Sequence, residues 1–146
     1  MLNKDEVLKA RDEGRIDVEP WRPENISDDG TITLHLANGV ELKSALQGEV
    51  QVEGKTEEIV RISHYPFNIR MDLKGYLEPE EKESYWVDTT TGRPARGVEI
   101  LISPRTIVIP GHNGPIRIPM LNRGTESFPM KKGTPVVKIY FEPLYD

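Results

Sequence analysis

The chain has 146 residues, no cysteine, a net charge of −5, 36% hydrophobic and 29% charged residues, which suits one soluble domain and excludes disulfides and thiolate metal sites. The acidic balance argues against a nucleic-acid duplex as partner, because phosphate contacts need a basic face. No apolar run approaches the roughly 20 residues that span a bilayer, and the charged N-terminus has no signal-peptide core. We therefore expect a cytoplasmic protein without membrane contact.

The N-terminal stretch predicts a short helix. Asn3 can cap it, the acidic Asp5 and Glu6 suit its first turn, and Gly14 suits its end. The alternating segment 16–20 predicts a strand, and a loop rich in Pro, Asn and Asp follows at 21–30.

Residues 31–44, TITLHLANGVELKS, predict a β-hairpin, because alternating apolar residues flank Asn38-Gly39, a dipeptide favoured in tight turns. An acidic stretch at 78–84 predicts an exposed loop. Ten or so short strands separated by Gly and Pro predict an all-β protein, a jelly roll or β-barrel with a short N-terminal helix. The further strands are expected at 49–52, 58–62, 67–73, 85–87, 98–102, 106–109, 116–120 and 136–141.

Three motifs stand out in chain order: LNKDEVLKARDEGRIDVEP at 2–20, VIPGHNGPIRIPMLN at 108–122 and MKKGTPVVKIYFEPL at 130–144. Together they resemble the trimeric dUTPase and dCTP deaminase superfamily: the opening helix and strand of the deaminases, the hairpin of both enzymes and their last strand. Residues 45–97 align poorly. The resemblance implies one dUTPase-like domain over 1–146, a distorted jelly roll, a homotrimer with active sites between subunits, and a role in pyrimidine deoxynucleotide metabolism.

Positions that carry acids in this superfamily carry other residues here. The resemblance places Ile109 where a dUTPase has the Asp that activates water, and Pro119 where a deaminase has its catalytic Glu. Thr33 stands at the Asp position of an early strand. We expect Ile109 to be a buried strand residue and Thr33 to face solvent. Pro119 is expected to confine its strand to a sheet edge or bulge.

Four side chains are candidates for ligand binding. Arg93 and Arg96, in GRPARG, either hold phosphate oxygens or are exposed loop arginines. His112 stands where the superfamily has an aromatic against the sugar, although PGHNG is also a plain tight turn. Lys138 either reaches a phosphate or lies on a solvated face. We expect no metal site and no cofactor, except Mg²⁺ if the protein is an active nucleotide hydrolase.

Two functions compete. The favoured hypothesis is a dUTPase-like and dCTP deaminase-like homotrimer that is non-catalytic or has altered chemistry, with a deoxynucleotide as the candidate ligand. The alternative is an active, divergent dUTP diphosphatase or dCTP deaminase with displaced acids, for which Asp72, Asp88 and Glu99 are the candidates. A third hypothesis is an unrelated jelly-roll binding module.

Overall fold

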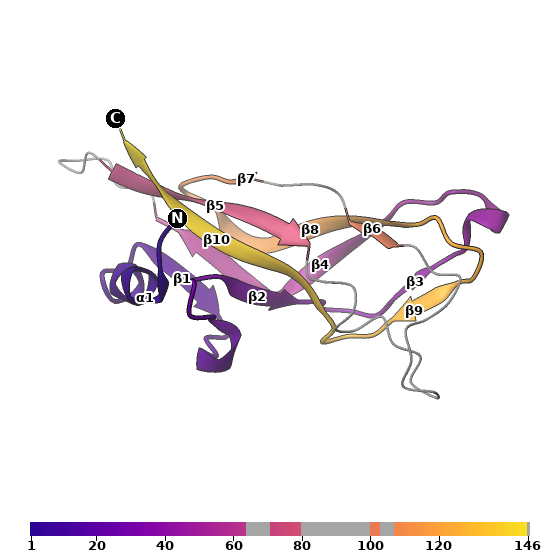
Figure 1. Ribbon diagram of the computed structural model, residues 1–146, viewed down its shortest axis with the longest axis horizontal. Coiled ribbons are helices and arrows are strands. Elements are labelled where there is room, and N and C mark those ends of the chain that lie inside the picture. The colour runs from indigo at the N-terminus through magenta and orange to yellow at the C-terminus, as the bar shows by residue number, and fades with distance from the viewer. Residues whose placement is uncertain (64–70, 80–99, 103–106, 146) are drawn as a thin grey trace.

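Two four-stranded antiparallel sheets and a small two-stranded sheet make up the protein in the computed structural model, which describes residues 1–63, 71–79, 100–102 and 107–145 (Figure 1). The first sheet has the order β1-β4-β8-β6 and the second the order β2-β10-β5-β7, while β3 pairs with β9. The predicted all-β class with a short N-terminal helix is confirmed. The elements are α1 (Lys4–Asp12), β1 (Ile16–Glu19), η1 (Pro23–Asn25), β2 (Ile32–His35), β3 (Val40–Leu42), η2 (Ala45–Gln47), β4 (Val52–Ile62), β5 (Met71–Pro79), β6 (Ile100–Ile102), β7 (Ile107–Val108), β8 (Asn113–Asn122), β9 (Phe128–Met130) and β10 (Pro135–Tyr145).

Helix α1 begins where the sequence predicts. The Asn3 side chain accepts a hydrogen bond from the Glu6 N–H (2.9 Å), and the Glu6 carboxylate accepts one from the Asn3 N–H (3.1 Å). This reciprocal cap satisfies backbone donors that the first helical turn leaves open. Val7 and Ala10 are buried. In the described part of the chain, no helix has the length and apolar character needed to cross a membrane.

Apolar side chains from both main sheets form one buried cluster, because the strands alternate inward and outward residues. Helix α1 adds to this cluster, and the chain before it lies against β10, where the Leu2 N–H donates to the Phe141 carbonyl (2.8 Å; Figure 1). The fully buried members include Leu34, Leu36, Val60, Ile62, Met120, Ile139 and Phe141.

The predicted hairpin at 31–44 is wrong. Strand β2 pairs with β10, and β3 pairs with β9. Gly39 does not have the positive φ of a primed turn. Instead, the Leu36 N–H donates to the Thr134 carbonyl (2.9 Å) and the Ala37 N–H to the Lys55 carbonyl (2.8 Å). Pairing with distant segments therefore overrides a local turn preference.

Other predicted boundaries also change. The strand expected at 58–62 is the second half of a longer strand, β4, which shares only Val52 with the strand expected at 49–52. Strand β9 has no counterpart in the prediction. Strand β5 extends to Pro79 and so includes the start of the loop expected at 78–84. The predicted segment 85–87 and the first residues of 67–73 lie outside the described residues.

The expectation for Pro119 needs correction, because β8 is an interior strand between β4 and β6. Pro119 is the register partner of Glu53, and the pairing of β8 with β6 covers Met120 to Asn122. Within the described residues, Pro119 thus lies just outside the ladder with β6, where a missing N–H breaks no bond of that ladder.

Candidate functional site

The segment predicted as a catalytic hairpin is a crossing between the two main sheets. Strand β7 pairs with β5 in one sheet, whereas β8 pairs with β4 and β6 in the other. The turn between them is bonded to the end of β4: the Gly111 N–H donates to the Ile62 carbonyl (2.6 Å), and the Ile62 N–H donates to the His112 carbonyl (3.0 Å). Gly111 has φ 90°, a value that glycine adopts at little cost.

This turn borders a hollow of about 340 Å³ between the end of β4, the start of β1 and the end of α1. Ligand pockets in proteins start at roughly 300 Å³, so the hollow has room for a small polar molecule. The side chains of Asp17, Arg61, Ser63, His112 and Asn113 line it.

Arg61 holds the central charge of the hollow. Its Nη1 donates to Glu19 Oε2 (2.8 Å) and Asp17 Oδ2 (3.1 Å), and its Nε donates to Asn113 Oδ1 (3.0 Å). The hydrogen bond with Glu19 and the neighbouring carboxylates raise the pKa of Arg61 above its ordinary value. The three hydrogen bonds hold the guanidinium in one orientation, and two carboxylates pair with its charge.

Of the two predicted site residues that the structure describes, His112 lines this hollow and Lys138 does not. It is half-buried, and its Nε2 lies 3.2 Å from the Gly114 carbonyl. If Nε2 carries the proton it donates to that carbonyl, and Nδ1 is then an acceptor. Arg61 was missed by sequence reasoning, because it lies in the region that aligns poorly with the superfamily.

Lys138 lies in the other main sheet, on β10, with Thr33 of β2 as its register partner. The structure therefore places His112 and Lys138 in different parts of one chain. Thr33 alternates with the buried Ile32 and Leu34, so it faces away from the core, as predicted. Arg93 and Arg96 lie outside the described residues, as do Asp88 and Glu99, and so does the Asp72 side chain.

Ile109 is not buried, contrary to prediction. It is 64% exposed in the turn that follows β7. The sequence pattern of Thr106 to Ile109 favours a strand, but β7 ends at Val108, and the turn bonded to β4 directs the next residue outward. Ile109 is thus an apolar residue in contact with solvent, and it does not contribute to the core.

A second irregular region lies midway along β4. The ladder with β8 pairs Lys55 with Arg117 and then Ile59 with Pro115, so that three residues of β4 stand opposite Ile116. The Thr56 hydroxyl fills the gap: it accepts from the Ile116 N–H (2.9 Å) and donates to the Glu58 carbonyl (2.8 Å). Bulges of this kind redirect side chains.

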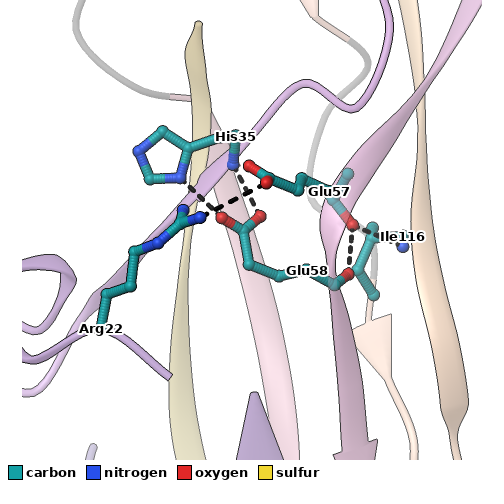
Figure 2. Close-up of polar contacts among 6 residues, drawn as sticks. Arg22, His35, Glu57, Glu58 and Ile116 are labelled. Carbon is teal, nitrogen blue, oxygen red and sulfur yellow. Dashed lines mark hydrogen bonds and ion pairs between the residues drawn. The ribbon is translucent and has the colours of Figure 1, made fainter. Parts of the chain in front are cut away.

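The bulge, residues 56–58, directs a carboxylate into the protein. Glu58 is 0% exposed. Its Oε2 accepts the His35 N–H (2.8 Å) and its Oε1 lies 2.6 Å from His35 Nδ1 (Figure 2). Because a buried charge is costly without partners, these two bonds offset its loss of water. They also join β2 at the edge of one sheet to β4 in the other.

Glu57, the preceding residue, has a different partner. Its Oε1 lies 3.4 Å from Arg22 Nη2, and both side chains are partly exposed (Figure 2). The sequence could have indicated the burial of Glu58, because Glu58, Val60 and Ile62 are alternate residues of the predicted strand and so lie on one face of it. The apolar Val60 and Ile62 mark that face as the buried one.

No set of three or more His, Asp or Glu side chains in the part of the chain described here gathers to hold a metal ion.

Comparison with known proteins gives a fold. No family model and no curated protein matches the sequence. Solved structures of the dUTPase of Staphylococcus bacteriophage 80alpha do match. One substituted form, with dUpNHpp, is 12% identical with a TM-score of 0.57 and covers 90% of this chain and 91% of that chain. A second, also with dUpNHpp, is 13% identical with a TM-score of 0.60 and covers 90% of this chain and 86% of that chain. The chain is an all-β protein of dUTPase-like fold.

Proposed function

We propose that the protein is a dUTPase-like homotrimer that binds a deoxynucleotide and is non-catalytic at the turn where the superfamily has its water-activating acid. Such a protein would act in cytoplasmic pyrimidine deoxynucleotide metabolism or in its regulation. The fold supports the proposal, and so does the hollow beside His112. The fixed guanidinium of Arg61 gives that hollow a polar wall.

The observation that carries the proposal is the exposure of Ile109. A buried isoleucine there would be explained by packing, but this side chain is 64% exposed. The backbone of the turn is kept by its bonds to β4, while the side chain has no group that could accept a proton. Both features support a fold that is retained without the acid that the resemblance leads one to expect at this turn.

Binding without hydrolysis suits a regulatory role. For the matched phage dUTPases, control of the transfer of virulence genes by a G protein-like mechanism is described, and forms were solved with dUpNHpp. A chain that holds a nucleotide and does not cleave it at this turn would keep a ligand-dependent state for longer.

The second candidate is an active, divergent dUTP diphosphatase or dCTP deaminase with a displaced acid. The buried Glu58 beside His35 is the observation that favours it, because it is a carboxylate in contact with a proton carrier. Asp72, Asp88 and Glu99 remain candidates on sequence alone.

Isothermal titration of the purified protein with dUMP, dUTP and dCTP tests the first proposal, and sedimentation measures the oligomeric state. We expect a trimer that binds at least one of these ligands, and weaker binding by at least about tenfold in Arg61→Gln, which loses the charge. Lys9→Gln, on the exposed side of α1, is the control. A monomer, or the absence of binding to all three ligands, would contradict the proposal.

A further inference from the structure

The sequence contains the dipeptide Asn-Gly twice, at Asn38-Gly39 and at Asn113-Gly114, and the structure places the two copies in opposite environments. We propose that Asn38 is a site of spontaneous chemical modification in the folded protein, where the side-chain amide becomes an acid through a cyclic imide. Asn113 is protected from the same reaction by its place in a sheet. This inference does not depend on nucleotide binding or on the oligomeric state.

The reaction joins two groups of the chain itself. The backbone nitrogen of Gly39 attacks the side-chain carbon Cγ of Asn38, a C–N bond forms, and the side-chain nitrogen leaves as ammonia. The proton of the Gly39 N–H passes through water to the departing nitrogen. Water then opens the cyclic imide at either carbonyl, which gives aspartate or isoaspartate, the isomer whose main chain runs through the former side chain. Only water is consumed, and nothing is oxidised or reduced.

The first support is the accessibility of both reacting groups. Asn38 and Gly39 are exposed in the connection between β2 and β3, and the ladder of β3 with β9 begins only at Val40. Among the residues that the structure describes, neither the Asn38 side chain nor the Gly39 N–H has a hydrogen-bond partner. Glycine has no Cβ, so the attacking nitrogen is open to approach.

The second support is the contrast with the other copy. Asn113 and Gly114 lie in the ladder between β4 and β8, opposite Arg61 and Val60. Asn113 Oδ1 also accepts a hydrogen bond from Arg61 Nε (3.0 Å). Attack requires backbone rotation that brings Cγ to the glycine nitrogen, and a paired strand permits this only after local opening. The ladder decides the contrast, since a cationic donor on Oδ1 would by itself make Cγ more electrophilic.

The third support is that the fold does not need this dipeptide at residues 38 and 39. A primed hairpin turn would give Gly39 a positive φ, and Gly39 has none. A Cβ at Gly39 would lie 3.5 Å from the Met130 carbonyl oxygen, which is an ordinary contact. Neither turn geometry nor packing therefore restrains the two residues against the reaction.

The modification would change the chain between two fixed points. On one side, the Ala37 N–H donates to the Lys55 carbonyl (2.8 Å), and on the other, Val40 is the register partner of Met130. Isoaspartate adds a methylene group to the main chain between these points, and both products add a negative charge. We therefore expect faster hydrogen exchange of the β3 amides in the isoaspartate form.

Peptide mapping by mass spectrometry tests the inference, with the natural protein incubated at mildly alkaline pH both folded and unfolded in urea. In the folded protein, we expect conversion at Asn38 to be at least about tenfold faster than at Asn113, where reaction awaits local opening. In urea, the two asparagines should convert at similar rates, because the ladder that protects Asn113 is gone. Labelling with an isoaspartyl methyltransferase should detect isoaspartate in the Asn38 peptide of the folded sample.

Gly39→Ala is the matched variant, because its Cβ hinders attack by the backbone nitrogen. Conversion at Asn38 should then fall at least about tenfold, with the melting temperature confirming that the variant is folded. If it does not fold, the comparison of Asn38 with Asn113 in the natural protein still decides. Equal conversion of the two asparagines in the folded protein, or faster conversion at Asn113, overturns the inference. Conversion at Asn38 that persists undiminished in Gly39→Ala, or that gives aspartate without isoaspartate, overturns it too, because neither result fits an imide.

Discussion

The turn at 109–112 and the bulge at 56–58 both have an irregular backbone, but their side chains differ in direction and in chemistry. In the turn, backbone bonds to Ile62 hold the chain, and the outward side chain of Ile109 carries no polar group. In the bulge, a hydroxyl replaces the missing ladder bonds, and the inward side chain is the charged Glu58. The exposed position is thus apolar and the buried position is ionisable, the reverse of the usual arrangement.

The exposed Ile109 and the buried Glu58 should therefore differ in how much the stability of the fold depends on them. An exposed isoleucine costs little, so the turn can lose an acid without loss of stability. A buried glutamate costs much unless it is bonded, so the bulge keeps its acid only with the two bonds to His35 in place. Stability measurements can therefore show which of the two regions the fold depends on.

The largest effect is expected at Glu58. Replacement by alanine leaves the His35 N–H without its acceptor and removes the link between β2 and β4. We expect Glu58→Ala to lower the free energy of unfolding in urea by about 3 kcal/mol or more. Glu57→Ala is the control: its partly exposed pair with Arg22 should contribute less than about 1 kcal/mol. Equal losses in the two variants would show that burial does not distinguish these glutamates.

How far the sequence predicts these regions depends on whether the determining contacts are local. The cap of α1 involves residues three apart and was predicted correctly. The hairpin at 31–44 was not, because the bonds of Leu36 and Ala37 run to Thr134 and Lys55. The turn at 109–112 has a local glycine signal, yet its exposure follows from docking on β4, which no local pattern contains.

The candidate site divides in the same way. His112 could be found from a motif, and it lines the hollow. Arg61 could not, because its partners Asp17 and Glu19 lie on a neighbouring strand more than forty positions away. The burial of Glu58 could be predicted from the alternation of residues along its strand. Its contact with His35 could not, because the register shift that brings the two together depends on the pairing of β4 with β8.

A smaller effect is expected from the hydroxyl that closes the bulge. Thr56→Val keeps the shape of the side chain but leaves the Ile116 N–H and the Glu58 carbonyl without this partner. We expect a loss of about 2 kcal/mol in the free energy of unfolding, measured by chemical denaturation. Thr134→Val is the control, because its hydroxyl bonds to the Lys131 carbonyl in an exposed turn and should contribute under about 1 kcal/mol. A loss below that of Thr134→Val would mean that the bulge is held by other contacts.

Near-zero effects are expected at the turn. Ile109→Asp restores an acid at the position where the resemblance places one, and Ile107→Asp is a matched control on the same segment, at 50% exposure. Each should change the free energy of unfolding by no more than about 0.5 kcal/mol. A loss above about 1 kcal/mol in Ile109→Asp, but not in Ile107→Asp, would show that the folded protein requires an apolar side chain there.

The smallest effect on stability is expected at Asp29, an exposed carboxylate that can be compared with the buried Glu58. Hydrogen bonds from the Thr31 backbone N–H (3.0 Å) and hydroxyl (2.8 Å) lower the pKa of Asp29 below its ordinary 3.8. The folded protein therefore binds this proton less readily than the unfolded chain does. The stability that Asp29 contributes is complete above pH 3.8 and is lost as pH falls through the lower, folded pKa.

Asp29→Asn should accordingly be less stable than the natural protein at neutral pH, by no more than about 0.5 kcal/mol, and the difference should shrink toward about pH 2. Urea denaturation at a series of pH values measures it. Asp28→Asn is the control, because the exposed Asp28 carboxylate makes only an ion pair with Lys4, at 3.9 Å. If the Asp29→Asn difference instead grows on acidification, the Thr31 bonds do not favour the ionised carboxyl. The hydrogen bonds alone would then not explain how much stability the exposed Asp29 and the buried Glu58 each contribute.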